Sequence, residues 1–249
     1  MLYARAPIAE AVVDLHASFD TAPTLRDLEQ LSQKYKERLP LVHGINSFAL
    51  NFAATFDGES DGAALKSNTT SEQLGYRLST SSSDRVLQVR RQGMAYSHMP
   101  PYTNWENFVE EMRPLWDAYV QTLKVVAVTR LAVRFINRLQ IATGVDIDEY
   151  VRLGPRIPAE VSKEFVGYFM QLVLPVSDLG PEFRTIVNTG VEPGTSPSAS
   201  ALVLDIDVFC EKRISIDGDG LWKTLERLRA HKNKVFEASI TDKVREMIR

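Results

Sequence analysis

Two segments of the chain place arginine and aspartate side chains at strand spacing, and these residues are the best suited to chemistry. In a strand over 129–140, alternation puts three arginines on one face and aliphatic side chains on the other. The same alternation over 202–211 puts Asp205, Asp207 and Phe209 opposite an aliphatic side. Guanidinium groups bind carboxylates or phosphates, and paired carboxylates are ligands that hard divalent cations prefer.

A third strand-like segment, 11–19, adds Asp14 and His16 on its more polar side. Together these segments define one set of candidate binding residues. The set is Arg130, Arg134, Arg138, Asp205, Asp207, Phe209, His16 and Asp14.

Three interpretations of this charged face remain open. In the first, Arg134 and Arg138 pair with Asp205 and Asp207 across neighbouring strands and fix the register of the sheet. In the second, the face docks a protein or peptide, because arginine beside aromatic residues such as Phe209 and Tyr168 is typical of interface hot spots. In the third, the sheet forms a polar tunnel in which the arginines hold phosphates and the two aspartates bind a divalent cation.

Searches for other catalytic motifs return none. The chain has no GxGxxG after a strand, no GxxxxGK[ST], no HExxH and no GxSxG. The single cysteine, Cys210, falls on the aliphatic side of its strand and is predicted to be a small core residue. His98, beside Met99 and two prolines, is predicted to pack in a loop. We therefore assign no catalytic residue, no metal ligand and no cofactor.

The hydrophobic pattern predicts an α+β protein built as two layers, a mainly antiparallel sheet with helices packed on one face. Helices are expected from Thr24, from Thr103 as a capping box with Glu106, and from Gly220. The polar stretch from Asp57 to Glu72 is expected to be a mobile loop. Strands are expected over 11–19, 48–56, 76–97, 129–140, 165–176, 183–191 and 201–216, and a short helix over 146–153.

The two halves, 1–124 and 125–249, follow a similar order of strand, helix, several strands and a closing helix. Trp105 and Trp222 lie at matching places on the closing helices. The pattern predicts a structural duplication whose halves pack as one compact unit. The alternative is that the halves merely share a common order of elements.

Composition excludes several classes of protein. The chain has 249 residues, 44% of them hydrophobic and 24% charged, which is typical of a packed globular protein. The net charge of −3 argues against a nucleic-acid partner, which needs a basic surface. No apolar run reaches the length of a membrane span, and residues 1–7 lack the features of a secretory signal. We expect a cytoplasmic protein with no membrane partner.

Six short stretches, taken as a set, carry a resemblance that spans nearly the whole chain. They are APIAEAVVD from Ala6, PYTNWENF from Pro101, RFINR from Arg134, LDIDVF from Leu204, KNKVFE from Lys232 and ITDK from Ile240. The set resembles a sporadically distributed bacterial protein family of uncharacterised function. The resemblance assigns no activity to any residue, but such a distribution resembles that of mobile accessory genes and implies a stress, toxin–antitoxin or phage-defence context.

From these observations we expect a non-enzymatic bacterial accessory protein that binds or regulates another protein, as an antitoxin-like or immunity-like partner would. The alternative is an enzyme or binder that acts on a phosphorylated small molecule in a charged sheet pocket, with or without a divalent metal. A third alternative is a homodimer whose charged face is merely hydrated.

Overall fold

The computed structural model describes residues 3–55, 64–158, 160–161, 167–193 and 199–249, with only the backbone described over 48–55, 64–71 and at 193. The elements in chain order are β1 (Ile8–Phe19), α1 (Leu25–Tyr35), β2 (Leu41–Thr55), β3 (Ala64–Ser79), β4 (Arg85–Arg90), β5 (Gly93–His98), α2 (Trp105–Leu123), β6 (Val125–Ala142), the 3-10 turn η1 (Ile147–Glu149), β7 (Phe169–Pro175), β8 (Phe183–Pro193), β9 (Ala199–Cys210), β10 (Ile214–Ser215), α3 (Gly220–Ser239) and α4 (Asp242–Ile248).

The strands form one ten-stranded sheet. Its order is β2-β3-β4-β5-β1-β6-β9-β8-β7, and β10 pairs with β6 beside this path. Each of these neighbouring pairs is antiparallel. The central pair joins the two halves of the chain, because β1 opens the first half and β6 opens the second. The predicted α+β class with a large antiparallel sheet is therefore confirmed.

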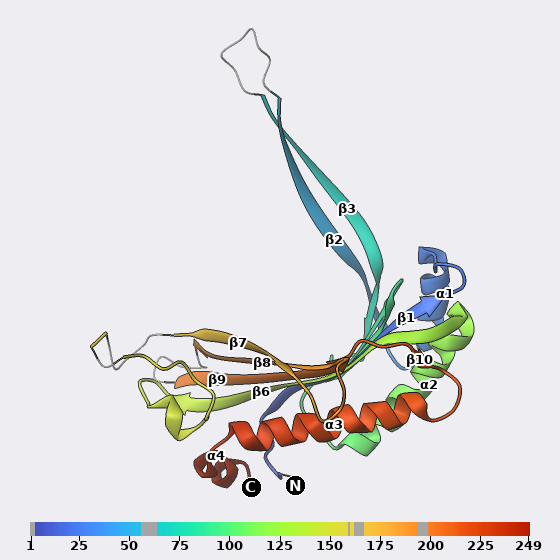
Figure 1. Cartoon of the computed structure of the whole chain (residues 1–249). Coiled ribbons are helices and arrows are strands. Elements are labelled where there is room, and N and C mark those ends of the chain that lie inside the picture. The colour runs from blue at the N-terminus through green and yellow to red at the C-terminus, as the bar shows by residue number, and fades with distance from the viewer. Residues whose placement is uncertain (1–2, 56–63, 159, 162–166, 194–198) are drawn as a thin grey trace.

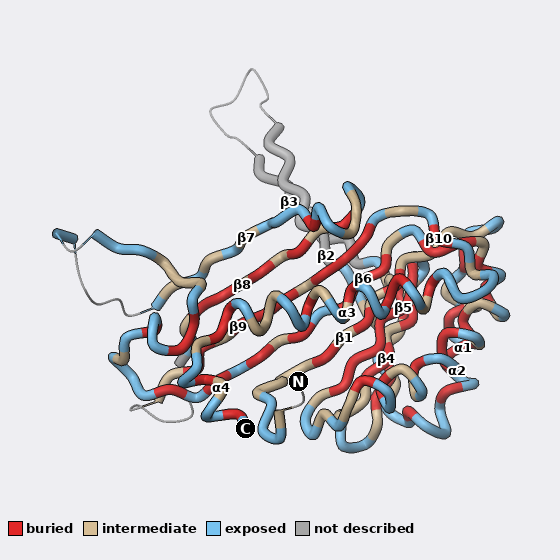
Figure 2. The backbone as a smooth tube through the Cα atoms, turned by 60° about the horizontal axis from the view of Figure 1, so that its bottom comes forward, coloured by how far each residue is buried: buried red, intermediate tan, exposed pale blue. Residues whose placement is uncertain are grey.

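The helices pack on one face of this sheet (Figure 1). Helix α3 contacts β6 and β9, α2 contacts β5 and β6, and α1 contacts β3 and β4. The hydrophobic core lies between these helices and the sheet. Alternate residues of the strands point into it, and Val13, Leu131 and Ile206 are fully buried there. Figure 2 shows buried residues along the central strands and largely exposed residues along β7, at the edge of the sheet.

A long hairpin, β2 and β3, leaves the sheet on the side away from α3 (Figure 1). Its strands pair from Leu41 with Ser79 to Thr55 with Ala64. The prediction of a loop from Asp57 to Glu72 is wrong over 64–72, which belong to β3, because polar residues in a two-stranded ribbon need no hydrophobic alternation. Residues 57–63 lie outside the described residues.

Of two helix N-termini predicted from capping residues, one is confirmed and one is shifted by a residue. Thr24 and Asp27 form a reciprocal capping box at the start of α1. The capping box predicted at Thr103 is wrong by one residue, because Asn104 is the N-cap of α2 and accepts a hydrogen bond from the Asn107 amide at 2.8 Å. The short helix expected over 146–153 is only the 3-10 turn η1.

None of the helices among the described residues is long and apolar enough to cross a membrane.

Candidate functional site

The candidate site is the sheet face opposite the helices, which we call the open face. Cross-strand neighbours share a face, so the register places residues from β1, β6, β9, β8 and β7 on it. All eight residues predicted as a binding set lie there. Arg134 stands opposite Asp207, and Arg130 stands opposite His16.

The strongest contact on the open face joins Arg134 and Asp205. The Arg134 Nε donates to Asp205 Oδ1 at 2.8 Å and its Nη2 donates to Asp205 Oδ2 at 2.7 Å, which is a bidentate pair. Asn188 of β8 also donates to Asp205 Oδ2, at 2.8 Å. The Asp205 carboxylate, only 4% exposed, is thus satisfied from both neighbouring strands. Its hydrogen bonds raise the pKa of Arg134.

Arg130 links two carboxylates on different strands. Its Nη1 donates to Asp14 Oδ1 and its Nη2 to Asp207 Oδ2, both at 3.3 Å. Its guanidinium also lies over the Phe209 ring, 4.6 Å from the centroid. Arg130 therefore fixes β1 to β9 across β6.

The two carboxylates that Arg130 contacts titrate in opposite directions. Burial opposes ionisation of Asp14, but contacts with His16 and Arg90 outweigh it and lower its pKa. Burial raises the pKa of Asp207, although Arg130 and the neighbouring guanidinium oppose it. Among the described residues, Asp207 Oδ1 is buried without a hydrogen-bond partner.

Two predicted contacts differ in the structure. Arg138 does not pair with either aspartate. Its Nη2 lies 3.6 Å from Glu192 of β8, because the register brings Val203 rather than a carboxylate opposite it. Tyr168, expected beside the arginines, precedes β7 by one residue and packs against the helix-side core, where its hydroxyl is 2.9 Å from Thr189 Oγ1.

Exposed apolar side chains extend the open face toward the edge of the sheet. Phe169 is 74% exposed and Val173 is 59% exposed. Val173 pairs with Ile186, which in turn pairs with Asp207, so Val173 lies beside the charged network, and Gln171 separates it from Phe169 along β7. The sequence predicted a strand over 165–176, but its exposed apolar side chains were not among the predicted binding residues, because exposure depends on the strand's place at the edge of the sheet.

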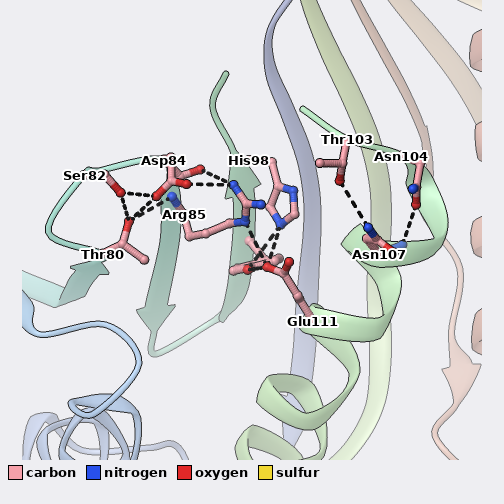
Figure 3. Close-up of polar contacts among 10 residues, drawn as sticks. Thr80, Ser82, Asp84, Arg85, His98, Thr103, Asn104, Asn107 and Glu111 are labelled. Carbon is pink, nitrogen blue, oxygen red and sulfur yellow. Dashed lines mark hydrogen bonds and ion pairs between the residues drawn. The ribbon is translucent and has the colours of Figure 1, made fainter. Parts of the chain in front are cut away.

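A second polar cluster lies at the other half of the sheet (Figure 3). His98 is fully buried, and its Nε2 is 3.1 Å from Glu111 Oε2 of α2. Arg85 Nε and the Tyr96 hydroxyl donate to the same carboxylate oxygen, at 2.9 and 2.8 Å. Burial and the Arg85 charge lower the pKa of His98 to about 4. The loop position predicted for His98 is wrong, since it ends β5.

Sequence reasoning also missed Arg90, Asn188 and Glu192, which complete the open-face contacts. Alternation within β4 would have placed Arg90 on the polar side, but only the strand order brings it beside Asp14. Within the described part of the chain, no three histidine, cysteine or acidic side chains gather closely enough to hold a metal ion. Cys210 is fully buried, as predicted, and burial raises its pKa.

No model of a protein family matches the chain, and no curated protein matches it significantly.

Proposed function

We propose that this chain is a non-enzymatic binding protein whose open face docks another protein. The observation that carries the proposal is that two large apolar side chains, Phe169 and Val173, are exposed beside the ordered charge network on the sheet face opposite the helices. Exposed apolar side chains beside arginine and aromatic residues are typical of interaction surfaces. The antitoxin-like or immunity-like role and the cytoplasmic location expected from the sequence belong to this same proposal.

The charge balance of the network supports a protein partner over a phosphorylated small molecule. Three arginines face three aspartates, and each arginine contacts at least one of them. The members are Arg90, Arg130, Arg134, Asp14, Asp205 and Asp207. A phosphate would have to displace a carboxylate from its arginine, whereas a protein surface can contact the network without breaking it. Two cavities of about 800 and 230 Å³ lie away from these residues.

The preformed network lowers one cost of such docking. Long arginine side chains lose conformational freedom when they are fixed at an interface, and about 0.5–1.5 kcal/mol is paid for each one. Arg130 and Arg134 are already held by hydrogen bonds in the free chain. A partner would therefore gain contacts with these residues at a reduced entropic cost.

The proposal is tested by separating the apolar and charged parts of the face. Replacing Phe169 and Val173 together with lysine should abolish partner binding and leave the melting temperature nearly unchanged, because both side chains are exposed. Alanine at Arg134 and Arg138 should weaken binding through the charged part. Met247→Lys, on the helix side and 40% exposed, is the matched control and should bind normally. Binding that survives the double lysine variant would contradict the proposal.

We also propose that the two halves arose by duplication. The strand order supports it: outward from the central pair, β5, β4, β3 and β2 follow β1 in reverse chain order, as β9, β8 and β7 follow β6. Each run of strands then leads to a long helix, α2 or α3.

A further inference from the structure

A cavity of about 800 Å³ lies on the helix side of the sheet, away from the open face. Four parts of the chain line it: residues 3–8, residues 100–106 with the start of α2, Phe135 and Asn137 of β6, and α3 from Arg229 to Glu237. Its size is in the range of small-molecule sites, which run from about 300 to 1,000 Å³.

Lys232 of α3 lines this cavity and is only 8% exposed. Its Nζ lies 3.7 Å from the centroid of the Phe135 ring. Its Nζ makes no hydrogen bond and no ion pair with the described residues. A buried ammonium normally has a carboxylate or carbonyl partner, because desolvation of an unpaired charge is costly.

The charged neighbours of Lys232 are already engaged with other groups. Glu237, one turn further along α3, accepts hydrogen bonds from the Tyr3 hydroxyl at 3.1 Å and from Arg245 Nε at 3.2 Å. Arg229 lies 3.5 Å from each of two carboxylates, those of Glu106 and Glu226. The cavity thus holds a cation whose counter-charge this part of the chain does not provide.

Burial and the Arg229 charge lower the pKa of Lys232 to about 7, and Glu237 only partly opposes this effect. An anion placed beside Nζ would reverse this shift, since a nearby opposite charge favours the protonated amine.

The walls of the cavity indicate what else the ligand must carry. Aromatic side chains from all four parts line it, beside the charged residues already named. They are Tyr3, Tyr102, Trp105, Phe135 and Phe236. Such walls favour a flat apolar body, because aromatic rings gain most from stacked or edge-on ring contacts.

We propose that this cavity binds an aromatic carboxylate, with the carboxylate paired to Lys232 and the rings packed among the aromatic walls. The site is separate from the open face, so the chain would combine a protein-docking surface with a small-ligand site. The carboxylate supplies the missing counter-charge and the rings fill the apolar space.

The test uses 2-naphthoate as the probe and 2-naphthamide as its neutral match, in calorimetric titrations of the full chain at pH 6. Wild-type protein should bind the carboxylate at least roughly tenfold more tightly than the amide, as expected for a charge-assisted contact in a buried site. Lys232→Met should lose this preference. Lys234→Met is the control, because Lys234 also lines the cavity but is exposed and pairs with Asp178 at 3.6 Å; it should keep the preference.

A second measurement needs no variant. If the ligand requires a protonated Lys232, its affinity for the wild-type chain should fall about 30-fold between pH 6 and pH 8.5, from the protonated fractions that a pKa near 7 gives. Glu106, Arg229 and Glu237 are the other charged groups near Lys232 in the cavity, and burial raises the pKa values of Tyr3 and Tyr102. Equal binding of the two probes, no binding of either up to about 1 mM, a preference that survives in Lys232→Met, or a flat pH dependence would each overturn the proposal.

Discussion

Replacing Lys232 with methionine should stabilise the protein, and the gain should shrink as the pH rises. Methionine has a similar length and flexibility, so it can fill the same space beside Phe135 without a charge. The buried amine has a pKa of about 7 in the folded chain and an ordinary pKa of 10.5 when exposed. Between these two values the unfolded chain binds a proton that the folded chain does not.

The magnitude follows from this difference at 1.36 kcal/mol per pH unit. The lowered pKa of Lys232 reduces the free energy of unfolding by roughly 5 kcal/mol well below pH 7. This loss is about 4 kcal/mol at pH 7 and about 2 kcal/mol at pH 9. Wild-type stability therefore rises with pH through this window relative to the variant. The stabilisation by Lys232→Met should be about 2 kcal/mol smaller at pH 9 than at pH 7.

Urea unfolding of the wild type and of Lys232→Met, followed by circular dichroism at pH 7 and pH 9, measures how the stability gain changes with pH. Other titrating groups contribute equally to both proteins and cancel. Lys234→Met, at an exposed position on the same helix, is the control and should change stability little at either pH. A gain that is the same at pH 7 and pH 9, or a loss of stability at pH 7, would refute the argument that an unpaired buried charge sits at Lys232.

Three further predictions concern the framework. The ring of His98 should titrate near pH 4 by NMR, and a midpoint near 6.5 would contradict this. Because unfolding restores an ordinary pKa near 6.5, about 3 kcal/mol of the stability present above pH 6.5 should be lost as the pH falls toward 4. Gly93→Ala should prevent stable folding, since an added Cβ would lie 1.9 Å from a carbonyl oxygen of β1, whereas Gly220→Ala, with open space around it, should be neutral or better in thermal melts. Arg134→Ala should cost about 1–2 kcal/mol in chemical unfolding, because Asp205 keeps one hydrogen bond and the arginine is half-exposed; a change under about 0.5 kcal/mol would show that the pair contributes little.

Much of the open face could be predicted from the sequence because strand alternation is a local property. Spacing alone placed Arg130 and Arg134 on the face opposite Leu131 and Val133. One interpretation of the sequence paired Arg134 with Asp205 or Asp207, and the structure pairs it with Asp205. The choice between the two aspartates and the partners of Arg130 could not be predicted, since they depend on strand order and register. Arg138 illustrates the limit: its neighbour is Glu192, on a strand that is not adjacent to its own.

The cavity around Lys232 escaped prediction for a different physical reason. A lysine in a helix is normally exposed, whereas the Lys232 side chain is buried over Phe135 of β6, which is far away in the sequence. Four of the short stretches singled out in the sequence, beginning at Ala6, Pro101, Arg134 and Lys232, contribute residues to this cavity. The fold brings these stretches together, and no single stretch indicates the cavity.

Native mass spectrometry of the tagged protein, gently purified from a host that carries its gene naturally, tests the central claim most directly. It reports protein partners, self-association and bound small molecules in one spectrum. Wild-type protein should carry a second protein at fixed stoichiometry, the variant with lysine at Phe169 and Val173 should lack it, and Met247→Lys should retain it. Wild-type protein that appears only as a bare monomer, or a partner that stays on the double lysine variant, would contradict the account of the open face as a docking surface.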